Sequence, residues 1–83
     1  MAVRIKICGI TNEEDALAAA RFGADALGFV FAPSPRRIST AKARKVIGAL
    51  PPLVQRVGVF VDEDREEVLS IAETCGLDIL QFH

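Results

Sequence analysis

The chain has 83 residues, of which 51% are hydrophobic and 25% charged, and its formal net charge is -1. This length fits one small domain or part of a larger one, and the composition is that of a globular protein. The balanced charge gives no electrostatic case for nucleic acid or an anionic membrane surface as a partner, and no apolar run approaches the length of a transmembrane helix.

The first elements are a strand and a helix. Isoleucines alternate with charged or polar residues near 3–8, a period of two that predicts a strand. Thr11 followed by Glu14 forms a capping-box pattern, so we expect Thr11 to be the N-cap of an alanine-rich helix near 12–22. Gly23 suits the left-handed position that ends such a helix.

The middle of the chain repeats this alternation. The apolar run near 26–31 predicts a buried strand, and the prolines that follow predict a loop. Ser39 is placed to cap a second helix near 40–50, whose apolar residues recur at helical spacing. A third strand is expected near 56–61.

The last part adds one more helix and one more strand. Either Asp62 or Asp64 is placed to cap a helix near 64–75, and Gly76 to end it. A fourth strand is expected near 79–83. Residues 23–27 and 76–80 share the pattern G-x-D-x-L, and both mark a helix end followed by a strand start. The sequence thus predicts a supersecondary unit that recurs within a single partial domain over residues 1–83.

The order of elements predicts an α/β fold with a parallel (βα)3β unit. A helix between consecutive strands implies a crossover, and crossovers of this type are right-handed. Lys6 and Cys8 share one face of the first strand, and Gln81 and His83 share one face of the last. An open sheet covered on both faces has apolar central strands, whereas the inner face of a barrel carries polar groups near its mouth. The pattern therefore favours a barrel over an open doubly wound sheet.

The two cysteines differ in their setting. Cys8 is the last inward side chain before a strand-end loop, where an α/β protein presents its chemistry, although cysteine is also a common buried filler. Lys6 lies on the same face, either to favour the Cys8 thiolate or as an interior charge paired elsewhere. Cys75 lies on the apolar stripe of its helix, and we expect it to be structural. The cysteines have no pairing pattern and no metal-ligand spacing, which indicates reduced thiols in a cytoplasm.

Other polar candidates lie at strand ends. Arg36 and Arg37 follow the second strand beside Ser34, which makes this loop either a solvated surface or a site for a carboxylate or phosphate. His83 lies on the polar face of the last strand. Asp25 and Asp78 stand at strand starts, away from these groups. The chain carries no glycine-rich nucleotide-binding motif.

Five motifs resemble those of the phosphoribosylanthranilate isomerase family, a family of TIM-barrel enzymes. They are residues 6–16 (KICGITNEEDA), 23–31 (GADALGFVF), 34–36 (SPR), 56–61 (RVGVFV) and 81–83 (QFH). The similarity runs in order along essentially the whole chain. The last motif departs from the family pattern, because Phe82 stands where a leucine is usual.

The resemblance implies the N-terminal part of a TIM barrel and a role in tryptophan biosynthesis. The family isomerises N-(5-phosphoribosyl)anthranilate, a phosphorylated small molecule, by an Amadori rearrangement without metal or cofactor. By resemblance Cys8 is the general base, Arg36 binds the anthranilate part of the substrate, and His83 lines the mouth. The family's general acid, an aspartate on a later strand, and its phosphate site are absent from these residues. We therefore expect the 83 residues alone to be inactive.

Two alternative functions are compatible with the sequence. One is a structural half-barrel that self-associates through strand edges at 3–8 and 79–83 and through an apolar inner face. We expect Leu27, Phe29, Phe31, Val57 and Val59 to line that face. The other is part of a different phosphate-binding barrel, in which Cys8 is merely buried and Arg36 binds another anion.

Overall fold

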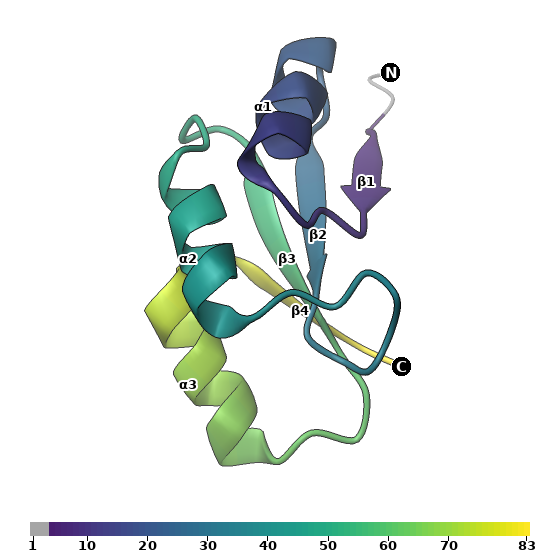
Figure 1. Cartoon of the computed structure of the whole chain (residues 1–83), viewed down its shortest axis with the longest axis vertical. Helices are drawn as coiled ribbons and strands as arrows, with labels where there is room; N and C mark the ends of the chain where they lie inside the picture. Colours follow the sequence, from purple (N-terminus) through teal and green to yellow (C-terminus); the bar gives the residue numbers. More distant parts are fainter. Residues whose placement is uncertain (1–3) are drawn as a thin grey trace.

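The structure is a computed structural model that describes residues 4–83. Strands and helices alternate along the chain (Figure 1). Their bounds are β1 (Lys6–Cys8), α1 (Glu13–Phe22), β2 (Ala26–Val30), α2 (Thr40–Gly48), β3 (Gln55–Phe60), α3 (Arg65–Cys75) and β4 (Ile79–Phe82).

The four strands form one parallel sheet in the order β1-β2-β3-β4. Figure 1 shows the three helices along one side of this sheet, with β1 at one edge. Each helix carries the chain from the end of one strand back to the start of the next, as a parallel pair requires. The expected parallel (βα)3β unit is confirmed, and its single helical layer is that of a barrel segment.

The strand expected near 3–8 begins only at Lys6, and residue 3 lies outside the described residues. The N-cap expected at Thr11 is wrong, because Asn12 holds that position. Its side-chain Oδ1 accepts from the backbone N–H of Asp15 at 2.7 Å, and its amide donates to Asp15 Oδ2 at 2.9 Å. Asparagine caps a helix as well as threonine does, so the cap moves one residue along the chain.

The other helix ends follow the sequence signals more closely. Ser39 caps α2, and its Oγ accepts from the backbone N–H of Lys42. Asp64, one of the two expected candidates, is the N-cap of α3 but makes no side-chain capping bond. Gly23 and Gly76 end α1 and α3 in the left-handed conformation, as expected.

The hydrophobic core lies between the sheet and the helices. Leu27 and Phe29 are fully buried there, and Phe31 packs in the same cluster. The expectation that these three side chains line the inner face of a half-barrel is wrong, since they face the helices. Val57 and Val59 of β3 do lie on the inner face, as expected, together with the alternate residues of the neighbouring strands.

Two aspartates join neighbouring strands at their amino ends by pairs of hydrogen bonds, which we call aspartate clips. Asp25 accepts the N–H of Ile5 at Oδ2 (2.7 Å), while its own N–H donates to the Ile5 carbonyl at 2.8 Å. Asp78 does the same to Arg56, at 2.9 and 2.8 Å. The G-x-D-x-L repeat in the sequence therefore has a physical basis, because each copy joins β1 to β2 or β3 to β4.

Candidate active site

Cys8 is the last residue of β1, and its thiol is exposed. In the strand register Cys8 lies opposite Gly28 of β2, on the inner face of the sheet. A Cβ built on Gly28 would lie 2.8 Å from the Cys8 Sγ and 3.2 Å from its Cα. Gly28 therefore provides the space that the thiol occupies, a role that its place within a strand does not reveal in the sequence.

The loop after Cys8 is anchored to the same glycine. The backbone N–H groups of Gly9 and Ile10 both donate to the Gly28 carbonyl, at 3.0 and 3.1 Å. Gly9 has a φ of +85°, a left-handed conformation that glycine adopts without steric penalty. The chain can thus turn sharply away from β1 and leave Cys8 at the carboxyl end of the sheet.

Arg36 reaches this turn from the loop after β2. Its backbone N–H donates to Ser34 Oγ at 3.1 Å, so the serine hydroxyl is an anchor within the loop. The Arg36 side chain runs over Gly9, where an added Cβ would lie 3.3 Å from its Cγ, and its Nη1 donates to the Gly9 carbonyl at 3.5 Å. The structure therefore places the Arg36 side chain against the residue that follows Cys8.

Arg37 is separated from Arg36 by the course of the loop. It forms an isolated parallel bridge with Val30, and it lines a hollow of about 400 Å³ that also contains Glu63 and Glu67. The two neighbouring arginines thus serve different surfaces. The structure brings Arg36 alone to the turn that follows Cys8.

Lys6, Gln81 and His83 form a second cluster on the inner face. The Lys6 ammonium, on β1, donates to Oε1 of Gln81, on β4, although 75 residues separate them in the chain. Gln81 Nε2 lies 2.7 Å from Nε2 of His83. This contact pairs the Lys6 charge with a group on another strand, as in the second of its two expected roles, but the partner is an amide and not a carboxylate.

The second cysteine is part of the helix packing. Cys75 is buried, and its thiol donates to the Thr40 carbonyl at 3.5 Å, which joins α3 to the start of α2. Burial raises the pKa of the Cys75 thiol, and the nearby Arg44 guanidinium partly offsets that rise. A buried thiol with a raised pKa is unreactive, which fits a structural role for Cys75.

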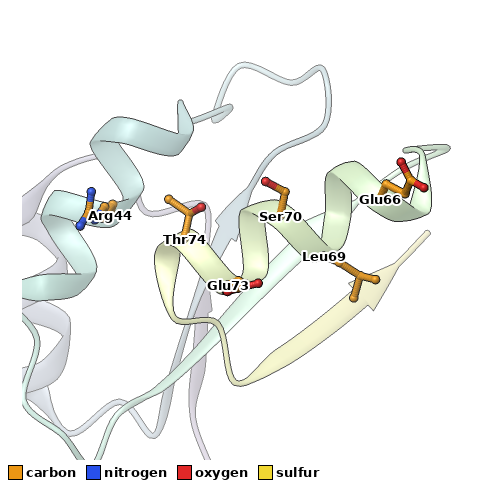
Figure 2. A pocket seen from close by; sticks show the side chains of 6 residues that line it. All are labelled: Arg44, Glu66, Leu69, Ser70, Glu73 and Thr74. Atoms are coloured by element: carbon orange, nitrogen blue, oxygen red, sulfur yellow. The ribbon is translucent and has the colours of Figure 1, made fainter.

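A hollow of about 750 Å³ lies away from these groups. Figure 2 shows it on the outer surface of α2 and α3, where its lining includes Arg44, Glu66 and Leu69. A smaller hollow of about 300 Å³ lies on the inner face and is lined in part by Lys6 and Gln81. Its lining also includes Asp25, Gln55 and Ile79, at the amino ends of β2, β3 and β4, so this hollow lies at the opposite end of the strands from Cys8 and Arg36.

Over residues 4–83, no three or more histidine, cysteine or acidic side chains are grouped so that they could hold a metal ion. In the same range, no helix has the length and apolar character needed to cross a membrane.

A thiol and a guanidinium at the carboxyl ends of parallel strands, with helices on the outer side alone, are features of an α/β-barrel enzyme. The chain matches the family model described as N-(5'-phosphoribosyl)anthranilate (PRA) isomerase over residues 5–83. It therefore belongs to the phosphoribosylanthranilate isomerase family.

Individual relatives agree with this assignment. The N-(5'-phosphoribosyl)anthranilate isomerase of Acidithiobacillus ferrooxidans is 57% identical over 82 residues, which are 98% of this chain and 40% of the relative. The crystal structure of the Thermotoga maritima enzyme superposes with a TM-score of 0.97 at 54% identity, over 99% of this chain and 40% of the enzyme. A phosphoribosyl anthranilate isomerase in complex with reduced 1-(o-carboxyphenylamino)-1-deoxyribulose 5-phosphate gives the same TM-score and identity, over 99% of this chain and 43% of that one.

The chain thus spans about 40% of the length of the relatives that it matches and corresponds to their N-terminal portion. The fold is the matching segment of a TIM barrel. This family membership excludes the alternative of an unrelated phosphate-binding barrel.

Proposed function

We propose that this chain supplies the general base and one substrate-binding residue of an N-(5'-phosphoribosyl)anthranilate isomerase. The observation that carries the proposal is the exposed Cys8 thiol at the end of β1, with the Arg36 side chain lying over the next residue, Gly9. Both groups stand at the carboxyl ends of parallel strands, where TIM-barrel enzymes hold their active sites.

Cys8 acts as the base in this proposal. When a general acid protonates the ring oxygen of the aminosugar, the ring opens and the proton on C2 becomes acidic. The Cys8 thiolate takes that proton, and the resulting enol-amine rearranges to the ketose without any redox partner. General base catalysis of this kind contributes about 10²- to 10⁴-fold in rate.

Arg36 binds the anthranilate part of the substrate. A guanidinium offers several N–H donors in a planar arrangement that matches a carboxylate, and anthranilate carries one. Its contact with the Gly9 carbonyl is long, at 3.5 Å, so most of its donors are left for a substrate. His83 lines the same mouth as a further substrate-binding residue.

The general acid and the phosphate site belong, in this proposal, to parts of the barrel beyond these 83 residues. The acidic residues Asp25 and Asp78 are engaged in strand clips at the amino ends, and so they are not placed to assist Cys8. We therefore expect no turnover from the 83 residues alone. A cytoplasmic location completes the proposal, since two free thiols suit a reducing compartment.

A chimera tests the proposal directly. This chain would replace the matching N-terminal segment of the Acidithiobacillus ferrooxidans relative, which is 57% identical to it over 82 residues. The chimera should isomerise N-(5'-phosphoribosyl)anthranilate, Cys8→Ala should lower kcat by at least about 100-fold, and Arg36→Met should raise KM. Cys75→Ala is the matched control and should retain the rate. A Cys8→Ala chimera with full activity would refute the role of Cys8 as base.

One observation favours a second function for the isolated chain, a self-associating half-barrel. Along β4, an edge strand of the sheet, Phe82 is 61% exposed and Ile79 is 40% exposed. Unpaired apolar edges of this kind promote association between copies. Light scattering should then show dimers or larger species that Phe82→Lys reduces, and a monodisperse monomer would exclude this function.

A further inference from the structure

A hydrogen-bonded chain crosses the inner face from β1 to the end of β4. It begins at the Lys6 ammonium, passes through the side-chain amide of Gln81, and ends at the His83 imidazole. Its members lie on the face that also bears Cys8. The proposed function gives Lys6 and Gln81 no task, although they bridge the first and last strands.

The Lys6 ammonium fixes which groups donate and which accept along these hydrogen bonds. A lysine ammonium has three donors and no acceptor, so the Gln81 atom that faces it must be the carbonyl oxygen, Oε1. The amide nitrogen of Gln81 then faces the histidine ring, and this nitrogen can only donate. The Nε2 atom of His83, at 2.7 Å, must therefore be the acceptor.

An imidazole nitrogen that accepts a hydrogen bond carries no proton. A neutral ring has a single N–H, so the proton of His83 must reside on Nδ1. We propose that Lys6, acting through Gln81, is a positioning residue that holds His83 as the neutral Nδ1–H tautomer. His83 then offers one N–H donor to oxygen-rich substrate groups at the barrel mouth, a consequence that rests on the proposed isomerase function.

The tautomer can be measured without any substrate. The chain contains a single histidine, so ¹⁵N-labelled protein gives one pair of ring-nitrogen signals, and no assignment is needed. The spectra are recorded at mildly alkaline pH. The ¹⁵N shifts and their couplings to the ring protons should then show a protonated Nδ1 and an unprotonated Nε2.

Two variants test the direction of the hydrogen-bond chain. Gln81→Glu keeps the shape but makes the central group an acceptor on both sides, so the His83 Nε2 should gain a proton and its ¹⁵N signal should move accordingly. Lys6→Met leaves the amide free to turn, and the fraction of Nδ1–H tautomer should fall. Lys42→Met removes the same charge from the exposed surface of α2 and should leave the tautomer unchanged.

The outcomes separate this inference from the proposed function. A wild-type His83 with Nε2 protonated, or with the tautomer mixture of a free imidazole, would overturn the inference, and so would a Lys6→Met tautomer equal to that of the wild type. Loss of catalysis in the Cys8 chimera bears only on the function. In the chimera, Lys6→Met should change kcat more than KM if the tautomer serves the reaction, and Lys42→Met should change neither.

Discussion

The space that Gly28 leaves for the Cys8 thiol gives the sharpest prediction. In Gly28→Ala the new methyl would lie 2.8 Å from Sγ and 3.2 Å from Cα of Cys8. Carbon and heavier atoms in optimal contact are about 3.5–4.0 Å apart, so the thiol must move by roughly 0.7 Å or β1 must shift. Overpacking of this kind costs about 1–3 kcal/mol of stability.

The effect on catalysis should exceed the effect on folding. A displacement of about 1 Å in a reacting group lowers the rate by about 100-fold. Measured in the chimera with the Acidithiobacillus ferrooxidans relative, kcat/KM of Gly28→Ala should fall by roughly that factor. Urea unfolding should report the loss of stability, and alkylation of Cys8 by iodoacetamide should slow.

Gly48→Ala is the matched control for this experiment. Gly48 ends α2, and a Cβ built there meets no atom within 4 Å. The added methyl should stabilise the helix by about 0.5–1 kcal/mol and leave kcat/KM unchanged. A Gly28→Ala protein with the wild-type alkylation rate and kcat/KM would refute the reasoning, because it would mean that the thiol does not depend on the space beside Gly28.

Two further predictions concern stability. Arg56 donates to three carbonyls in the loop between α2 and β3, those of Leu50, Pro51 and Val54. Arg56→Met should therefore lower the free energy of unfolding in urea by about 1 kcal/mol, whereas the exposed Arg21→Met should not. Burial raises the pKa of Cys75, so the folded chain holds this proton more tightly than the unfolded chain. This contribution is complete below the ordinary cysteine pKa of about 8.5 and is lost as pH rises through the higher folded value. Unfolding free energy measured from pH 7.5 to pH 9.5 should therefore fall more steeply in Cys8→Ala, which keeps Cys75, than in Cys75→Ala, and equal slopes would contradict the assignment.

The hydrophobic periodicity and the residues that begin and end helices were sufficient to predict the order of the helices and strands. Helical spacing, glycines at helix ends and apolar runs each depend on neighbours within a few residues, and the structure keeps them at Gly23, Ser39 and Gly76. The cap at Asn12 was missed because threonine and asparagine compete for the same role at adjacent positions, and the choice depends on which one reaches Asp15.

The faces of the central strands could not be predicted from the sequence. β2 and β3 are apolar on both faces, so the alternation of side chains does not show which face is the inner one. The sequence-based prediction therefore placed Leu27, Phe29 and Phe31 on the wrong face. The strand register provides the missing information, because Cys8 lies opposite Gly28, and this fixes which residues of β2 face inward. A glycine opposite a candidate nucleophile is the signal that would have identified Gly28.

The candidate site was predictable only in part. Cys8 and Arg36 were identified by their motifs, and both lie beside Gly9 in the structure. The contact between Lys6 and Gln81 joins residues that are 75 positions apart. It depends on how strongly the sheet curves, a property of the whole sheet that no local pattern encodes.

The paired aspartate clips have a consequence for how such a protein can change over time. Asp25 and Asp78 fasten neighbouring strands at the amino ends, while Cys8 and Arg36 occupy the carboxyl ends. Substitutions at the carboxyl ends of the strands leave the aspartate hydrogen bonds intact, so the residues that contact a substrate can change while the protein still folds. Each aspartate joins one strand to the next along the chain. A duplicated strand–helix–strand segment would therefore contain its own aspartate hydrogen bonds, and a sheet could gain strands by such duplication.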